Sequence, residues 1–148
     1  MDHERVGGQP ITNADLLITK CDVLIPAALE DAFDAESAKR VQATMVVEGA
    51  NGPTPPQGDE VFRARGIVVV PDILANAGGV TVSYLEWVQN LQHVTWKLDH
   101  IESTLSETMR TAYRAVSALA RERKLDLRTS AYIIGIGRVG RAAVLQSL

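Results

Sequence analysis

The chain has 148 residues, a net charge of −3 and a single cysteine, Cys21, which excludes a disulfide framework. Its lysine and arginine residues are scattered rather than clustered, which argues against a nucleic-acid partner. The first ten residues hold no apolar signal region, and no apolar run reaches the roughly 18 residues that a membrane span requires. We therefore expect one cytoplasmic structural unit with no membrane contact.

Three short apolar runs rich in β-branched residues predict the strands of a buried parallel sheet. They cover residues 21–28, 44–51 and 66–73, and none alternates apolar with polar residues as a strand with one wet face would. A helix is expected over residues 34–42, where an aspartate can cap its first turn, and another over residues 54–66, where a glycine can end it. This βαβαβ order is typical of half of a doubly wound sheet.

The pattern becomes helical after Asp72. Residues 76–92 carry apolar side chains at helical spacing, and residues 98–124 form the clearest helix of the chain. The apolar stripe of this second helix runs through Ile101, Leu105, Met109, Ala112, Val116 and Leu119. The predicted fold class is therefore α/β, with a partial doubly wound (Rossmann-like) parallel sheet of about three strands followed by a C-terminal helical segment.

Gly135, Gly137 and Gly140 match the GxGxxG spacing of a dinucleotide-binding turn. That turn requires a second strand and an acidic residue about 20 positions later, and only eight residues follow Gly140. We therefore predict a helix here, buried along one broad apolar stripe. The stripe comprises Tyr132, Ile133, Ile136, Val139, Ala143 and Leu145.

Small residues and amide side chains follow each of the three predicted strands. Ala27 and Ala28 follow the first strand, Asn51 and Gly52 the second, and Asn76 the third. Because the carboxyl ends of parallel strands meet at one edge of the sheet, these residues are expected to gather there. Small residues admit a flat ligand, and asparagine can both donate and accept hydrogen bonds, although each loop alone could simply form a turn.

Other polar residues give weaker signals. Glu48 and Asp72 could act as acid or base, but a carboxylate at a strand end more often caps a helix or pairs with an arginine. His3, His93 and His100 are too dispersed to indicate a catalytic group or a metal site, so no metal is expected.

Two adjoining stretches carry a family resemblance, VVEGANGPTPPQGDE and GIVVVPDILANAGGVTVSYLEWVQNLQ. They resemble the C-terminal part of glutamate dehydrogenases, in the Glu/Leu/Phe/Val dehydrogenase family. CDVLIPAALE upstream and RTSAYIIGIGRVGRAA downstream are similar to the same family in the same order. The resemblance implies that residues 1–75 form the C-terminal half of a dinucleotide-binding domain. Residues 76–148 would pack on it as helices that border the substrate cleft, within one structural unit.

The resemblance also implies roles for individual residues. Ala27, Ala28, Asn51 and Gly52 would lie along NAD or NADP, and Asn76 near its nicotinamide end. Val80 and Ser83 would line the amino-acid pocket, with the Ser83 hydroxyl directed to the side-chain carboxylate of glutamate. No residue of this chain matches the family's catalytic lysine and aspartate, so we assign no catalytic residue.

Two functions of different classes follow. The first is the C-terminal portion of an NAD(P)-dependent glutamate dehydrogenase, which deaminates L-glutamate oxidatively to 2-oxoglutarate and ammonia; the portion would be inactive alone. The alternative is a non-catalytic partner that docks onto a full-length or N-terminal dehydrogenase chain through a bare sheet edge. In either case a companion chain or a homo-oligomer is expected. A free-standing nucleotide-binding module built on Gly135–Gly140 ranks last.

Overall fold

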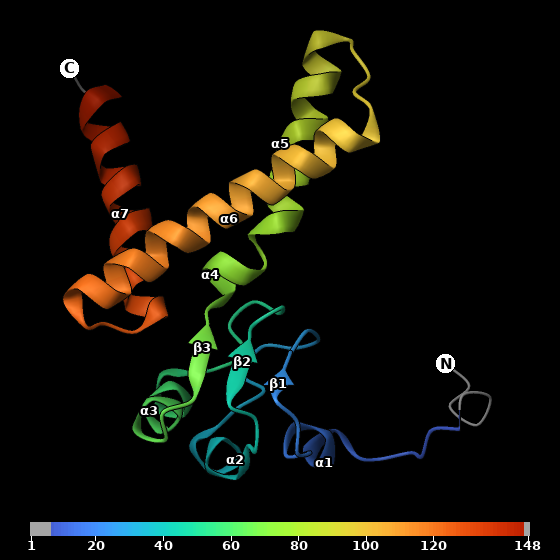
Figure 1. Ribbon diagram of the computed structural model, residues 1–148, viewed down its shortest axis with the longest axis vertical. Coiled ribbons are helices and arrows are strands. Elements are labelled where there is room, and N and C mark those ends of the chain that lie inside the picture. The colour runs from blue at the N-terminus through green and yellow to red at the C-terminus, as the bar shows by residue number, and fades with distance from the viewer. Residues whose placement is uncertain (1–6, 147–148) are drawn as a thin grey trace.

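The computed structural model describes residues 7–146, so residues 1–6, with His3, and residues 147–148 lie outside the described part. Its sheet consists of the strands β1 (Val23–Leu24), β2 (Met45–Val47) and β3 (Val68–Val70). All pairing is parallel and the strand order is β1-β2-β3 (Figure 1). The predicted α/β class with a three-stranded parallel sheet followed by helices is confirmed.

The strands are shorter than the apolar runs that predicted them. Pro26 and Pro71 follow β1 and β3 closely, and proline cannot donate a ladder hydrogen bond. After β2, the amides of Gly49 and Ala50 both donate to the carbonyl oxygen of Pro26, at 3.0 and 2.8 Å. The last residues of each predicted strand therefore form loops at the carboxyl edge of the sheet.

Helices α1 (Asn13–Leu17), α2 (Ala35–Arg40) and α3 (Pro56–Ala64) lie beside the sheet (Figure 1). The expected cap of α2 is present, because the Asp34 carboxylate accepts a hydrogen bond from the Ser37 amide at 2.7 Å. A core joins α2 and α3 to one face of the sheet, with Phe33, Ala38, Val41, Ala43, Val46, Phe62 and Ile67 as its buried members.

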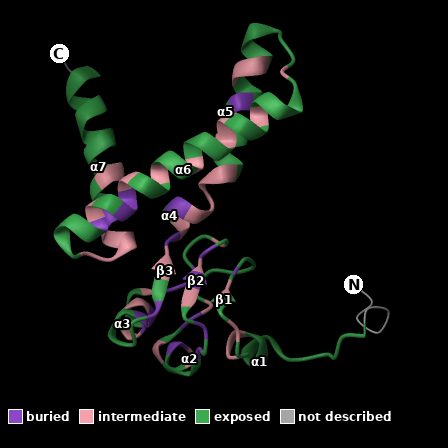
Figure 2. Ribbon diagram, in the orientation of Figure 1, coloured by how far each residue is buried: buried purple, intermediate pink, exposed green. Residues whose placement is uncertain are grey.

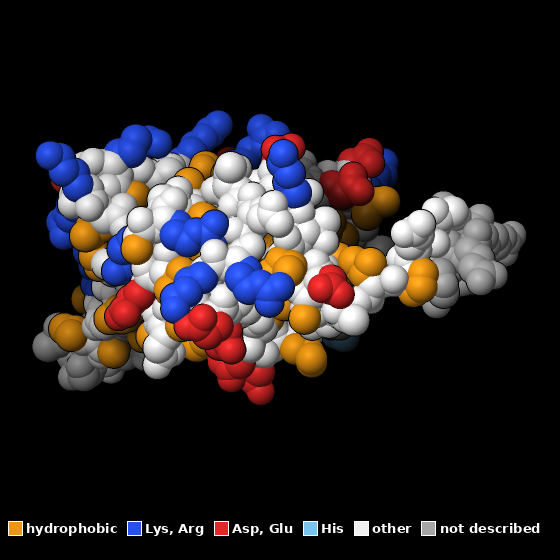
Figure 3. Space-filling view, turned by 90° about the horizontal axis from the view of Figure 1, so that it is seen from below, with side chains coloured by type: hydrophobic (Ala, Val, Ile, Leu, Met, Phe, Trp, Pro, Cys, Tyr) orange, Lys and Arg blue, Asp and Glu red, His pale blue; other side chains and the backbone are white. Residues whose placement is uncertain are grey.

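The other face of the sheet is only partly covered. Val23 and Val68 are 46% and 45% exposed, whereas Val46 on the covered face is fully buried. The expected burial is thus complete on one face only. On the other face, Val70 packs against Val116 and Ala131 of the helical segment, but Val68 only shares the lining of a cavity with Ala120 and Leu127. At the amino ends of the strands, basic side chains lie beside acidic ones on the surface (Figure 3).

The helical segment comprises α4 (Asp72–Ala75), α5 (Ala77–Gln92), α6 (Leu98–Arg123) and α7 (Leu127–Gln146). A second core links three of these helices through Leu74, Val116 and Ala131, with Ala112 packed against it. The predicted stripe of α6 therefore does face inward. Within residues 7–146, no helix combines the length and the apolar character needed to cross a membrane.

Helix α7 runs straight through the GxGxxG stretch, as predicted, but the predicted burial of its stripe is wrong. Ile136, Val139 and Leu145 are 67%, 71% and 67% exposed, and Tyr132 and Ile133 are also exposed. Only the first turns of α7 contact the body; the rest projects away from the other described elements (Figures 1 and 2). Amphipathic spacing identified the helix but not what covers its apolar side.

Candidate functional site

The carboxyl edge of the sheet holds a cavity of about 640 Å³. Its walls come from the loops after β1 and β2, from the junction between α4 and α5, and from the first turn of α5. The lining residues are Ala28, Leu29, Glu30, Gly49, Ala50, Asn51, Asn76 and Val80. Four residues expected to contact ligand, Ala28, Asn51, Asn76 and Val80, therefore meet at one cavity.

The side chains of Asn51 and Asn76 are joined across this cavity. Asn76 Nδ2 donates a hydrogen bond to Asn51 Oδ1 at 2.6 Å, which ties the loop after β2 to the start of α5. Within residues 7–146, Asn51 Nδ2 and Asn76 Oδ1 have no hydrogen-bond partner. One free donor and one free acceptor are therefore held in place beside the cavity.

Close packing fixes the first two loops against each other. A Cβ on Gly49 would lie 3.1 Å from Ala27 Cβ, so a larger residue at Gly49 would push the loops apart. Gly52 has φ +55, a backbone conformation that glycine adopts without steric cost. Its amide donates to Asp72 Oδ2 at 2.8 Å. Ala27 and Gly52 therefore support the cavity from outside its lining.

Ser83 lies on the exposed surface of α5, one helical turn after Val80. It is not part of the cavity lining. The structure thus places Ser83 next to the cavity rather than in it.

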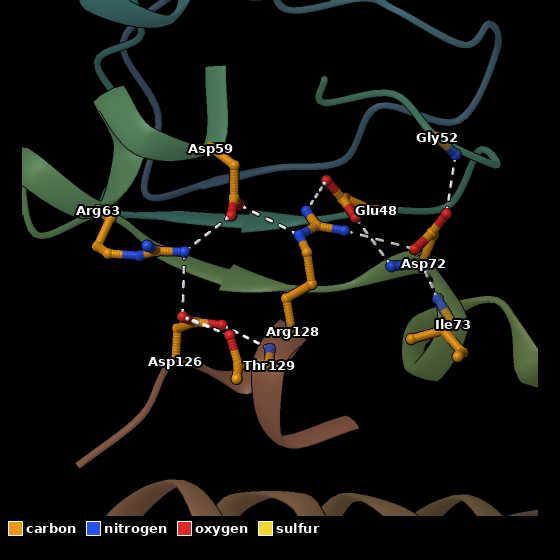
Figure 4. A network of polar contacts seen from close by, with 9 residues as sticks. All are labelled: Glu48, Gly52, Asp59, Arg63, Asp72, Ile73, Asp126, Arg128 and Thr129. Carbon is orange, nitrogen blue, oxygen red and sulfur yellow. Dashed lines mark hydrogen bonds and ion pairs between the residues drawn. The ribbon is translucent and has the colours of Figure 1, made fainter. Parts of the chain in front are cut away.

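An ionic network beside the cavity pairs Glu48 and Asp72 with an arginine that the sequence analysis did not single out (Figure 4). Its centre is Arg128 of α7, whose guanidinium lies between three carboxylates. The N–O distances are 2.6 Å to Glu48, 3.2 Å to Asp59 and 3.5 Å to Asp72. The Glu48 side chain is fully buried, and its second oxygen accepts a hydrogen bond from the Asp72 amide at 2.9 Å. Asp72 also accepts a hydrogen bond from the amide of Ile73 at 2.8 Å.

These contacts favour a structural role for Glu48 and Asp72 over an acid–base role. Both are engaged with an arginine and with backbone amides, which was the structural alternative to an acid–base role. Glu48 required a cation because it is buried, but Arg128 lies 80 positions away and no local pattern could have paired the two residues.

The network shifts the pKa of two side chains, in each case in favour of the charged form. Burial lowers the pKa of Arg128, but hydrogen bonding and attraction to Glu48, and then to Asp59, outweigh it and raise the pKa above its ordinary value. For Asp126, burial raises the pKa, but hydrogen bonds from the Thr129 amide and hydroxyl, together with Arg63, lower it below the ordinary 3.8. Both groups are therefore charged at neutral pH.

A parallel sheet flanked by helices, with small residues and amides at its carboxyl edge, defines a Rossmann-like α/β protein. A sequence profile described as Glutamate/Leucine/Phenylalanine/Valine dehydrogenase matches residues 2–147. The chain belongs to this dehydrogenase family and corresponds to its C-terminal part.

Individual relatives agree with the assignment. The glutamate dehydrogenase of Thermotoga maritima is 53% identical over 135 residues, covering 91% of this chain and 32% of that protein. The NAD-specific glutamate dehydrogenase of Staphylococcus aureus is 44% identical, covering 91% of this chain and 33% of that protein. The crystal structure of the hetero-hexameric glutamate dehydrogenase of Thermus thermophilus, in its Leu-bound form, matches with a TM-score of 0.89 and 32% identity. That match covers 99% of this chain and 36% of that one. The chain spans about a third of the length of these relatives.

Proposed function

We propose that this chain forms the part of an NAD(P)-dependent glutamate dehydrogenase that lines the cofactor cleft and the floor of the amino-acid pocket. The observation that carries the proposal is the Asn51–Asn76 hydrogen bond at the edge of the strand-end cavity, in a chain of this family. The complete reaction is the oxidative deamination of L-glutamate to 2-oxoglutarate and ammonia.

The cavity suits part of a dinucleotide. Its volume of about 640 Å³ lies within the range of small-molecule sites. Ala27, Ala28, Asn51 and Gly52 would hold NAD or NADP along the edge, and Asn76 would orient its nicotinamide end. When bound, the nicotinamide accepts or supplies the hydride.

Val80 and Ser83 would form the floor of the pocket for glutamate or 2-oxoglutarate. Val80 lines the same cavity as Asn76, and Ser83 stands one turn further along α5, so both can face one small molecule. An apolar side chain beside a hydroxyl suits a substrate with an aliphatic chain that ends in a carboxylate.

We assign no catalytic residue to this chain. Glu48 and Asp72 are held by Arg128 and by backbone amides, so neither is free to remove a proton from the substrate ammonium. A companion dehydrogenase chain would supply that base, because further copies of this chain would bring the same engaged carboxylates.

We also propose the division into residues 1–75 and 76–148 within one unit. Its support is that one core lies entirely within residues 1–75, whereas the second core joins Val70 and Leu74 to Val116 and Ala131 across the boundary and so ties the two parts into one unit. A cytoplasmic location is proposed because the chain has a single, unpaired cysteine.

Fluorescence titration of the 148-residue chain with NADH and NADPH tests the proposal first. We expect the chain to bind at least one of the two nucleotides and the Asn51→Ala variant to lose that binding. Next, co-expression with the N-terminal two thirds of the Thermotoga maritima relative should restore glutamate-dependent NAD(P)H formation. A folded mixture that neither binds nucleotide nor forms NAD(P)H would overturn the proposal.

The second candidate is a non-catalytic partner that docks onto a dehydrogenase chain. The specific observation is that β1 forms an edge of the sheet, and that Val23 and Ile25 beside it are 46% and 59% exposed. Such an edge can pair with a strand of another chain. Val23→Lys should abolish co-purification with a dehydrogenase chain if docking uses this edge. A monodisperse monomer that shows no association would count against it.

A further inference from the structure

The carboxylate of Asp72 connects two segments at the carboxyl edge of the sheet that are separate in sequence. Its Oδ2 accepts a hydrogen bond from the Gly52 amide at 2.8 Å, and its Oδ1 accepts one from the Ile73 amide at the start of α4, also at 2.8 Å. Asn51 immediately precedes Gly52, and Asn76 immediately follows α4. Asp72 therefore links the loop that carries Asn51 to the helix that Asn76 follows, and these two asparagines are hydrogen-bonded to each other.

Arg128 restrains Asp72 from the opposite side. Its Nη1 lies 3.5 Å from Asp72 Oδ1, and the side chains of Arg128 and Asp72 are only 18% and 19% exposed. Arg128 is in turn held by Glu48, which also accepts the hydrogen bond from the Asp72 amide. The Asp72 residue is thus held both at its backbone amide and at its carboxylate (Figure 4).

Arg128 does not line the strand-end cavity and belongs to α7, the last helix described. It lines a neighbouring cavity of about 380 Å³ together with Gly52 and Asp72. Its link to the Asn51–Gly52 loop runs through the Asp72 carboxylate, which accepts the hydrogen bond from the Gly52 amide. A charged acceptor makes the hydrogen bond to the Gly52 amide stronger than a neutral acceptor would.

We propose that Asp72 and Arg128 are positioning residues for the nucleotide site, which hold the Asn51–Gly52 loop where Asn51 meets Asn76. This inference rests on the proposed function. It assigns the start of α7 to the cofactor edge. Further along the same helix, Gly135 lies beside Ile73 of α4, where an added Cβ would come 3.9 Å from Ile73 Cδ1.

Asp59 offers a matched control, because it also lies against Arg128, at 3.2 Å, but makes no hydrogen bond to the loop. Asp72→Ala and Asp59→Ala each remove one carboxylate from the same guanidinium. Positioning predicts that Asp72→Ala weakens NADH binding roughly tenfold or more, whereas Asp59→Ala changes it less than about twofold. A purely structural role predicts similar changes for both variants.

The Gly52 amide gives a readout that needs no nucleotide. In ¹⁵N-labelled protein, its proton resonance should move upfield in Asp72→Ala and, to a smaller extent, in Arg128→Lys, and stay in place in Asp59→Ala. If Asp72→Ala does not fold, Asp72→Asn keeps an acceptor oxygen without the charge and should show an intermediate shift. An unmoved Gly52 resonance in the folded Asp72 variant would overturn the inference.

Nucleotide titrations of the same variants separate the two proposals. A wild-type chain that binds neither NADH nor NADPH contradicts the proposed function, and it also removes the nucleotide site that this inference requires. Wild-type binding that Asp72→Ala and Arg128→Lys leave unchanged contradicts the inference alone. Weaker binding in both variants, together with the shift of Gly52, supports it.

Discussion

Asn76 donates a hydrogen bond from its side-chain amide to the side-chain carbonyl of Asn51, 2.6 Å away and 25 positions earlier in the chain. The substitution Asn76→Asp replaces the donor by a carboxylate oxygen, which repels Asn51 Oδ1 and places a negative charge beside the cavity. We expect nucleotide affinity to fall roughly tenfold or more, measured by fluorescence titration with NADH.

Asn13→Asp is the matched control for this substitution. Asn13 is exposed in the first turn of α1, and an acidic residue is favourable there. Nucleotide affinity should be unchanged in Asn13→Asp. Equal losses in the two variants would mean that net charge, and not the Asn51–Asn76 contact, controls binding.

Glu48→Gln removes the charge of a fully buried side chain and leaves Arg128 without its nearest partner. Removing one partner of a buried ion pair typically costs about 3–5 kcal/mol of unfolding free energy, because the other charge stays buried. Here we expect about 2–3 kcal/mol, since Asp59 still faces Arg128 and the glutamine can accept a hydrogen bond. Urea unfolding followed by circular dichroism measures the difference.

Glu36→Gln provides the comparison on an exposed ion pair. The Glu36 and Lys39 side chains of α2 are 79% and 57% exposed, so solvent screens their attraction. The loss should stay below about 0.5 kcal/mol. A Glu48→Gln variant as stable as Glu36→Gln would show that the buried network contributes little.

Local signals in the sequence predicted most of the fold, and long-range contacts account for what they missed. Asp34 caps α2 and Gly66, at φ +71, follows the end of α3. Both residues affect only the backbone next to them, so the local sequence was enough to predict their roles. The Glu48–Arg128 pair joins residues 80 positions apart, and the exposed stripe of α7 depends on what lies opposite it. Neither the ion pair nor the exposure of the stripe can be predicted from the spacing of residues along one segment of the sequence.

The same distinction applies to the candidate site. Small residues after each strand predicted where Ala28, Asn51 and Asn76 would gather, because parallel strands bring their carboxyl ends together. The sequence offered an arginine pairing for Glu48 and Asp72 but could not identify Arg128, since that residue lies far away in the sequence, on α7. The local sequence pattern predicted that the site lies at the carboxyl edge of the sheet, but contacts between distant residues hold its loops in place.

Asp126 makes stability depend on pH in the acid range. Its Oδ1 accepts a hydrogen bond from the Thr129 amide at 2.7 Å and its Oδ2 lies 3.1 Å from Arg63, so its pKa in the folded protein is below the ordinary 3.8. On acidification the unfolded chain therefore takes up its proton first. The stabilisation is complete above the ordinary pKa and is lost as pH falls through the folded pKa.

Asp126→Asn isolates this contribution from that of the other carboxylates. Asparagine still caps the helix but cannot ionise, so near pH 6 the variant should be less stable than wild type by about 1 kcal/mol or less. Urea unfolding near pH 6 and near pH 3 should show the two proteins converging at the lower value. A stability difference that grows on acidification would contradict the assigned direction of the shift.

Gly58→Ala tests the packing of α3 on the loop before α2. An added Cβ would lie 2.5 Å from the Phe33 carbonyl oxygen, and the Phe33 backbone is held by the hydrogen bond that its amide donates to the Pro53 carbonyl oxygen at 3.0 Å. We expect a loss of about 2 kcal/mol in unfolding free energy, because overpacking exceeds the gain in helix propensity. Unchanged stability would mean that α3 can shift outward at little cost.

Gly137→Ala tests the opposite case on α7. An added Cβ at Gly137 would meet no heavy atom within 4 Å, and the residue lies in the interior of a 20-residue helix. Alanine favours a helix over glycine, so unfolding free energy should rise by about 1 kcal/mol. Nucleotide affinity should not change, because the glycine is part of a helix and not of a phosphate-binding turn. If NADH binding weakened strongly while the helix became more stable, the cofactor would have to be placed at α7 instead of at the carboxyl edge of the sheet.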